Sequence, residues 1–362
     1  LYLFLSLIMK NIYLQLAEYE TAANGLVLAT VVAANGSTPQ KPGSSALFLS
    51  GRLIAGTVGG GIVENKVSLY AAKCVEARES ALLRFNLDMD TDDPEEAVCG
   101  GTLSILVDSD PLRSSQVFRE MAESLRASRP GVLVTRVVPW NDSTILISRC
   151  WATTECEPHV PGNDDDMIAT EVIQMLSDGV RAGYRKLEMT IPGEQHPATV
   201  FLEPVFPPQR LIIAGAGHVG RAVARQGRIL GFEVTVIDDR PEYANSQNLP
   251  DADNIIVRDI GEAMRETPKD SGTYIVIVTR GHSHDAEALR PCIGSEAAYV
   301  GMMGSKIKVA KMHEEFIMKG WATEEQWERI YTPIGIDIGS QTVEEIAVSI
   351  AAQLIIKRGN RQ

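Results

Sequence analysis

A glycine-rich turn at residues 211–220 carries the clearest chemical signal in the sequence, which runs Leu-Ile-Ile-Ala-Gly-Ala-Gly-His-Val-Gly there. An apolar strand enters the G-x-G-x-x-G pattern directly, and a helix follows it. Gly215 would allow the tight turn, Gly217 the close approach of a phosphate, and Gly220 close packing of helix on strand. Free N–H groups at the helix start favour an anion. The spacing therefore predicts a Rossmann motif with a phosphate-binding turn.

An acidic residue ends the next predicted strand. Asp238 follows Gly220 by 18 residues, a position where a carboxylate can bind the 2′-hydroxyl of a ribose. A carboxylate there favours NAD over NADP because it repels a 2′-phosphate, although the neighbouring Arg240 weakens that preference. The fold does not fix the ligand. The sequence therefore leaves open whether the crevice beside this glycine turn binds a nucleotide, a pterin phosphate or no ligand.

A polar loop follows the apolar run TYIVIVT and reads Thr279-Arg-Gly-His-Ser-His-Asp285. Ligands of doubly wound folds bind beyond the carboxyl ends of strands. His282, His284 and Asp285 are therefore candidates for acid–base chemistry or metal binding. The structural alternative is that Ser283 or Asp285 caps the following helix.

The run AAYVGMM leads into another predicted strand-to-helix turn at Gly304 and Ser305. These residues would cradle an anion at the helix start, with Lys306 adding positive charge. The alternative is an ordinary connection in which Ser305 is the helix N-cap.

Two glycine turns in the first half of the chain are further candidate binding motifs. Residues 56–64, Gly-Thr-Val-Gly-Gly-Gly-Ile-Val-Glu, place Gly59, Gly60 and Gly61 before a predicted helix, and Glu64 lies in its first turn. Three glycines in a row are costly in chain entropy unless the backbone needs them. They form either a cradle for a phosphate or a pterin, or a tight structural turn.

The second of these turns is Cys99-Gly100-Gly101. An accessible thiolate at Cys99 would bind a soft metal or carry sulfur. The alternative is a small buried hydrophobic residue. Cys150, Cys156 and His159 lie close together in the sequence but lack a C-x2-C pair, so a polar linker is favoured over a zinc site there.

Composition excludes several classes of protein. The chain has 362 residues and a net charge of −13, with no Lys/Arg-rich stripe, so nucleic acid is not an expected partner. Five scattered cysteines favour a reducing compartment, and we expect a cytoplasmic protein. The N-terminal apolar run LYLFLSLIM is too short to cross a bilayer, which takes roughly 20 residues, and it does not resemble a signal peptide. Met9 is a candidate natural start.

The elements that position these residues change character along the chain. In the first part, helices are expected at 10–23, 59–77, 112–127 and 166–177, with strands at 26–33, 46–50, 52–58, 82–87, 131–138 and 143–148, a Cys-Gly-Gly turn feeding a strand within 98–108, and a hairpin at 182–203. A polar stretch from Cys150 to Asp166 suits an exposed loop. Prolines at 204–208 indicate a boundary, and the predicted domains are 1–205 and 206–362.

Beyond that boundary, short and nearly continuous apolar runs alternate with helical segments. This pattern is typical of a buried parallel sheet with helices on both faces. The predicted fold class is α/β, with an N-terminal α/β domain and a C-terminal Rossmann-like, doubly wound parallel-sheet domain.

The ordered set of motifs resembles the XdhC/CoxI family, the xanthine dehydrogenase accessory proteins. The first half matches at residues 35–43 (Asn-Gly-Ser-Thr-Pro…Pro-Gly), 56–64 and 99–101. The second half matches at 215–220, 238, 279–285, 299–305 and 332–339. The stretch from Cys150 to Asp166 matches no family pattern.

The resemblance implies a non-enzymatic accessory protein that binds molybdenum cofactor (molybdopterin) and protects it while its sulfur ligand is installed. The cofactor would then pass to a molybdenum hydroxylase resembling xanthine dehydrogenase. A cofactor sulfurase and that hydroxylase would be its partners, and a homodimer is implied. By the same resemblance Cys99 becomes a candidate contact for the metal or its sulfur. The candidate cofactor contacts are Gly59, Gly60, Gly61, Glu64, Cys99, Gly100, Gly101, Gly215, Gly217, His218, Gly220, Asp238, Gly304 and Ser305.

Two other hypotheses compete with the carrier. An NAD(P)-dependent oxidoreductase would use the same Rossmann motif, with His282, His284 and Asp285 as its acid–base candidates, but the chain has no Tyr-x-x-x-Lys pair. A purely structural docking protein would keep the fold and use none of these sites. Ligand binding distinguishes the three.

Overall fold

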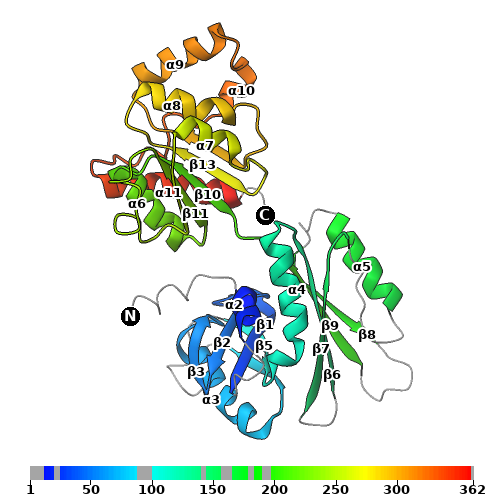
Figure 1. Cartoon of the computed structure of the whole chain (residues 1–362). Helices are drawn as coiled ribbons and strands as arrows, with labels where there is room; N and C mark the ends of the chain where they lie inside the picture. The colour runs from blue at the N-terminus through cyan, green and yellow to red at the C-terminus, as the bar shows by residue number, and fades with distance from the viewer. Residues whose placement is uncertain are drawn as a thin grey trace. The chain divides into compact units, whose positions relative to one another are not determined.

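The computed structural model describes residues 12–19, 25–87, 100–139, 144–155, 165–177, 183–189 and 197–359. The chain divides into two compact units, Leu1–Pro207 and Pro208–Gln362 (Figure 1). The division falls between two prolines, two residues beyond the boundary expected from the sequence.

The first unit contains two antiparallel sheets. One has the order β3-β2-β1-β5-β4, and the other β7-β6-β9-β8. The strands of the first are β1 (Leu26–Gly36), β2 (Ser45–Leu49), β3 (Arg52–Gly56), β4 (Ala81–Asn86) and β5 (Gly101–Asp108). Those of the second are β6 (Gly131–Pro139), β7 (Ile145–Ala152), β8 (Arg185–Met189) and β9 (Ala198–Val205).

Helices cover these sheets because each presents one apolar stripe. The helices are α2 (Ile12–Glu18), α3 (Gly61–Ala77), α4 (Ser115–Arg126) and α5 (Asp165–Ser177), and a 3-10 turn at Pro111–Ser114 precedes α4. Val63 and Val67 of α3 join the core formed by β1, β2 and β5. Helices α2 and α4 share a second core with the other face of β1 and with β6. Helix α5 packs on the second sheet.

The polar loop expected from Cys150 to Asp166 is wrong in its first residues. The polar loop predicted from Cys150 begins later, because β7 continues to Ala152 and pairs with β6 through Val134 and Cys150. Trp151 and Ala152 are buried by that pairing. Cys156 and His159 lie outside the described residues.

The second unit is a five-stranded parallel sheet of order β12-β11-β10-β13-β14. Its strands are β10 (Arg210–Ala214), β11 (Glu233–Asp238), β12 (Asn254–Val257), β13 (Thr273–Ile277) and β14 (Tyr299–Met302). Its helices are α6 (His218–Ile229), α7 (Ile260–Glu266), α8 (His282–Leu289), α9 (Lys306–Met318), α10 (Glu324–Glu328) and α11 (Val343–Gly359).

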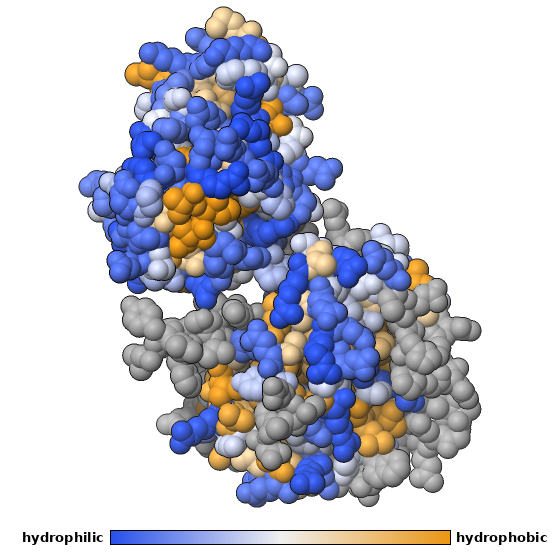
Figure 2. Space-filling view, viewed as in Figure 1, coloured by the Kyte–Doolittle hydropathy of each residue, from blue (hydrophilic) through white to orange (hydrophobic). Residues whose placement is uncertain are grey.

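Both faces of the parallel sheet are covered. Helices α6 and α11 bury one face, and α7, α8 and α9 bury the other. For that reason the buried residues of the central strands β10 and β13 are nearly all apolar, Thr273 at the start of β13 being the exception. Figure 2 shows that the visible surface of this unit is mostly hydrophilic. The predicted α/β class and the doubly wound C-terminal domain are confirmed.

Strand order sets the location of any ligand in this unit. The chain leaves β10 toward β11 on one side, and β13 lies on the other side of β10. This reversal is the topological switch point, beyond which open α/β sheets bind ligands. None of the described helices is long and apolar enough to span a membrane.

Candidate functional site

Three distant segments of the first unit meet where β1 ends and β5 begins. The two strands pair Gly36 with Gly101. The Ser37 N–H donates to the Gly100 carbonyl at 3.0 Å. A Cβ added at Gly101 would lie 2.5 Å from the Asn35 carbonyl oxygen and 2.6 Å from that of Ser37. These contacts leave no room for a side chain, so close approach of the backbones explains the glycine.

The glycine turn before α3 joins the same place. A Cβ added at Gly59 would lie 3.0 Å from the Pro39 side chain, which belongs to the segment after β1. Gly60 and Gly61 have φ values of 66° and 52°, and no atom lies within 4 Å of their added Cβ positions. This pair therefore presents bare backbone at the start of α3. We call the segments 35–39, 57–64 and 100–101 the glycine-loop cluster.

Glu64 fastens this turn. Its Oε1 accepts hydrogen bonds from the Thr57 hydroxyl at 2.5 Å and from the Val58 N–H at 3.3 Å. The Thr57 hydroxyl oxygen in turn accepts from the Gly59 N–H at 3.2 Å. The carboxylate thus holds the turn in shape beneath the free N–H groups of the first helical turn. Cys99 lies outside the described residues and directly precedes Gly100.

A titratable carboxylate that the sequence analysis missed lies at the other end of the loop after β1. Glu203 of β9 accepts a hydrogen bond from the Tyr13 hydroxyl at 2.7 Å. A Cβ added at Gly43 would lie 3.7 Å from Glu203 Oε1. Burial raises the pKa of Glu203 to about 7, against the lowering effects of the Tyr13 hydrogen bond and the Arg149 charge. A lone Glu in an apolar strand gives no sequence signal for this role.

The glycines of the second unit separate into two kinds. A Cβ added at Gly215 would lie 2.5 Å from the Val278 carbonyl oxygen, and one added at Gly220 would lie 1.9 Å from the Gly215 carbonyl oxygen. Packing of the fold therefore requires both. Gly217, the N-cap of α6, has nothing within 4 Å of its added Cβ, and neither does Gly281, the N-cap of α8. Bare backbone faces open space at the start of both helices.

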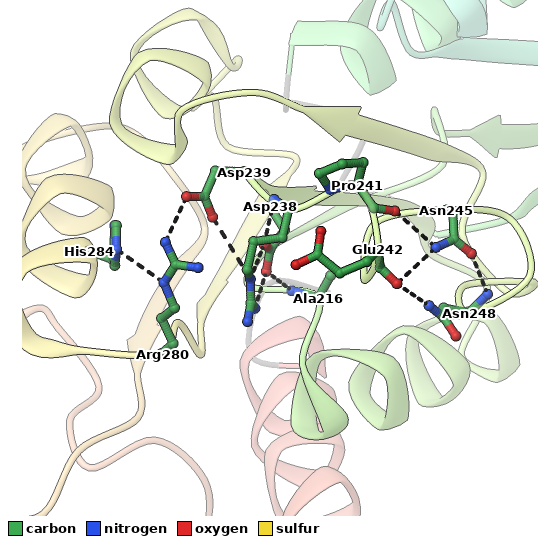
Figure 3. A network of polar contacts seen from close by, with 10 residues as sticks. Ala216, Asp238, Asp239, Pro241, Glu242, Asn245, Asn248, Arg280 and His284 are labelled. Atoms are coloured by element: carbon green, nitrogen blue, oxygen red, sulfur yellow. Dashed lines mark hydrogen bonds and ion pairs between the residues drawn. The ribbon is translucent and has the colours of Figure 1, made fainter.

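Asp238 is closed off by the protein itself (Figure 3). Its side chain is 1% exposed, and it accepts hydrogen bonds from the Ala216 N–H at 2.7 Å and from the Arg240 guanidinium at 2.8 and 2.9 Å. Burial alone would raise the pKa of Asp238, but these donors outweigh it and lower the pKa to about 2. In this arrangement the carboxylate has no open face for the ribose expected from the sequence.

The next carboxylate along the chain, Asp239, forms an ion pair with Arg280 at 2.8 Å. The Arg280 Nε donates to His284 Nε2 at 3.2 Å. Figure 3 shows these groups as one line of contacts that joins the ends of β11 and β13. Half-exposed charges at this edge of the sheet are therefore paired with one another.

The predicted acid–base residues are engaged in other contacts. Asp285 is 1% exposed and accepts hydrogen bonds from the Thr279 hydroxyl and from Lys308 of α9, so it anchors the loop. His282 lies 3.2 Å from a carboxylate oxygen of Glu315. Helix α8 begins at His282 with Gly281 as its N-cap, so the structural alternative, capping by Ser283 or Asp285, is wrong.

The last predicted turn has an ordinary geometry. Ser305 is the N-cap of α9, and its side chain accepts a hydrogen bond from the Lys308 N–H at 3.4 Å. A Cβ added at Gly304 would lie 3.2 Å from the Val309 side chain. No group of three or more His, Cys, Asp or Glu is placed to hold a metal ion within the part of the chain that the structure describes.

Each unit contains a match to a known family model. Residues 21–86 match the model of the XdhC and CoxI family, and residues 211–354 match that of the XdhC Rossmann domain. Both matches are to models of XdhC proteins, one in each half of the chain.

Similar proteins cover nearly the whole length of this chain. A probable xanthine dehydrogenase subunit from Bacillus subtilis (strain 168) is 27% identical over 333 residues, which is 92% of this chain and 93% of that protein. "Uncharacterized protein YqeB" of Escherichia coli (strain K12) is 22% identical over 351 residues. Those residues are 97% of this chain but only 47% of the E. coli protein, so the chain spans about half of that relative.

A solved structure shows the same fold. The crystal structure of a xanthine dehydrogenase from Bacillus halodurans matches with a TM-score of 0.75 and 24% sequence identity, covering 97% of this chain and 96% of that one.

Proposed function

We propose that this protein is an accessory protein for a xanthine-dehydrogenase-like molybdenum hydroxylase, and that it binds and delivers molybdenum cofactor. The two family matches support the accessory role. The meeting of three glycine-bearing segments at the start of α3 is the observation that supports cofactor binding at the glycine-loop cluster.

The chemistry of the cluster fits a phosphorylated pterin. Gly60 and Gly61 leave backbone N–H groups uncovered at the N-terminus of a 17-residue helix, where the positive dipole end favours a phosphate. Glu64 and Thr57 hold that turn in place before any ligand arrives. A pre-formed turn of this kind lowers the entropy that binding must otherwise remove.

Cys99 is the candidate contact for the reactive end of the cargo. It directly precedes Gly100, whose carbonyl is fixed by Ser37. A thiolate is a suitable ligand for a soft metal or for sulfur. We propose that Cys99 contacts the metal or its sulfur ligand while the backbone holds the phosphate. A sulfurase as partner, a homodimer and a cytoplasmic location belong to the same proposal.

The alternative, an NAD(P)-dependent oxidoreductase, is less well supported. Asp285 is buried in an ion pair with Lys308, and Asp238 is covered by Arg240. Neither carboxylate is open to a substrate or a ribose in this arrangement.

The test is retention of the cofactor by the full chain. The protein is loaded anaerobically with sulfurated molybdenum cofactor and desalted, and molybdenum and oxidised-pterin fluorescence are measured in the protein fraction. We expect both near one per protein chain, on the order of a single saturated site. Elution of neither with folded protein contradicts the proposal.

A thiol variant with a matched control tests the position of the site. Cys99→Ser is expected to reduce retention of the sulfurated cofactor and to leave the circular dichroism spectrum unchanged. Cys74→Ala removes a buried thiol of α3, whose pKa burial raises to about 11, and should retain the cofactor. Equal retention by Cys99→Ser and the parent protein removes Cys99 from the site.

A further inference from the structure

Helices α6 and α11 cover one face of the parallel sheet, and part of their outer surface is apolar. Val348, Ile355 and Ile356 of α11 are 47%, 45% and 50% exposed. Ile229 at the end of α6 is 49% exposed. Figure 2 shows an orange patch on the otherwise hydrophilic visible surface of this unit, where Figure 1 places α11. A contiguous apolar patch rimmed by polar residues marks an interaction surface.

Helix α11 is apolar on its outer side as well as on its inner side. No charged residue occurs between Ile346 and Ile356. Ala347, Ile350 and Leu354 fill the core on the inner side. A helix that is apolar all round is normally buried on all sides. The outer residues of α11 are not needed for packing on the sheet, so a second protein surface is the expected cover.

The same surface carries opposite charges on its two helices. Arg221 and Arg225 of α6 are exposed one turn apart, and neither side chain forms an ion pair or hydrogen bond with a residue that the structure describes. Like charges at this spacing slightly destabilise a helix by themselves. On α11, Glu344 is exposed in the first turn. We call this surface the α6–α11 face, which comprises Arg221, Arg225, Ile229, Glu344, Val348, Ile355 and Ile356.

The two helices run in the same direction. Both contribute along their length to one core, and their last turns lie side by side, because the Arg358 guanidinium donates to the Leu230 carbonyl at 2.8 Å. Counting back from that contact at about 1.5 Å per residue, Ile229 is level with the exposed isoleucines in the last turns of α11. The two arginines of α6 lie toward the other end, where α11 is acidic.

We propose that a second copy of this chain docks on the α6–α11 face, with a two-fold axis parallel to the two helices. Such an axis places α6 of one copy against α11 of the other at the same level, and each contact occurs twice. Ile229 of one copy then meets Ile355 and Ile356 of the other. The two arginines face the end of α11 that bears Glu344. The face is therefore complementary to itself in both apolar surface and charge.

This inference rests on the homodimer of the proposed function and adds the surface that forms it. Sedimentation velocity of the full chain over a series of micromolar concentrations tests it. We expect the parent protein to sediment with twice the 39.4 kDa mass of one chain. Ile355→Glu places a charge within the apolar contact and should raise the dimer dissociation constant about tenfold or more.

Met318→Glu is the matched control for a charge on an exposed apolar residue. Met318 is 81% exposed at the end of α9, which covers the opposite face of the sheet. This variant should dimerise like the parent protein. The thermal transition of each variant verifies folding.

An exchange of charges distinguishes a contact across the axis from a local effect. The double variant Arg221→Glu, Arg225→Glu makes both sides of the contact acidic, and Glu344→Arg makes both sides basic. Each should dimerise about tenfold or more weakly than the parent. An equimolar mixture of the two brings opposite charges together at both contacts and should recover the dimer.

Three results overturn the proposal. The first is a parent chain that is monomeric at every concentration; if Ile355→Glu then also melts at a lower temperature, the face is covered by another part of the same chain. The second is an Ile355→Glu variant that dimerises as tightly as the parent. The third is a mixture that is no more dimeric than its two components. Cofactor retention is measured separately on each variant, so loss of this interface is distinguishable from failure of the carrier function.

Discussion

The glycine-loop cluster and the Rossmann crevice are built from the same residue type in different ways. In the cluster, segments from three parts of the chain meet through backbone contacts, and the turn at Gly60 and Gly61 is left uncovered. In the crevice, the turns that follow the adjacent strands β10 and β13 lie side by side, and ion pairs cover their edge. The backbone of the first turn is therefore open, whereas the charged side chains at the edge of the crevice are already paired with one another.

Two buried carboxylates, one in each unit, also differ in how their charge is balanced. Burial raises the pKa of Glu203 to about 7 in the first unit, where its hydrogen-bond donor is an uncharged tyrosine. Arg240 and two backbone N–H groups hold the pKa of Asp238 at about 2 despite burial. The first unit therefore carries a proton-sensitive group near neutral pH, and the crevice carries a permanent negative charge that is already neutralised.

The largest expected effect is a loss of stability when the tightly packed Gly220 is replaced. Gly220→Ala places a Cβ about where the structure has only 1.9 Å to the Gly215 carbonyl oxygen, so we expect a loss of about 3 kcal/mol in the free energy of unfolding. Gly217→Ala has open space and a φ of −68°, which alanine adopts, and should change stability by less than about 0.5 kcal/mol.

Denaturant unfolding of both variants checks this contrast. If both variants have the same stability, packing does not separate the two glycines and the contrast between them is wrong.

A smaller effect, the change of stability with pH, tests the difference between the two carboxylates. The pKa of folded Glu203 is about 7, above its ordinary value of 4.5, so the folded state binds the proton more tightly than the unfolded state. This contribution to stability is complete below about pH 4.5 and is lost as the pH rises through 7. Relative to Glu203→Gln, the parent protein should lose about 1–3 kcal/mol between pH 5 and 8.

Urea unfolding at several pH values measures that difference. Asp238→Asn is the matched comparison. The pKa of Asp238 lies far below this range, so the difference in stability between the parent protein and Asp238→Asn should not change between pH 5 and 8. A parent protein whose stability runs parallel to that of Glu203→Gln across the range would show that Glu203 titrates normally.

Much of the second unit could be predicted from the sequence because its motif is local. Strand, glycines, helix and acid follow one another between Arg210 and Asp238, so their order alone defines the turn. The covering of Asp238 could not be predicted, since any acid at that strand end satisfies the pattern. It depends on the conformation of Arg240, two residues further along.

The first unit shows more clearly that contacts between distant segments could not be predicted from the sequence. The glycine turns were identified one by one, but their meeting depends on the register that pairs Gly36 with Gly101, 65 residues apart. No spacing rule contains that register. The extension of β7 through Trp151 was missed for a related reason, because pairing with β6 decides where the strand ends and the polar residues beyond it suggested an earlier stop.

The most direct test of the proposed carrier function is amide hydrogen exchange of the full chain, with and without molybdenum cofactor bound. Binding at the glycine-loop cluster predicts slower exchange at residues 35–39, 57–64 and 100–101, with residues 215–220 and 279–284 unchanged. Slower exchange confined to those segments of the Rossmann crevice, with the cluster unaffected, would contradict the account.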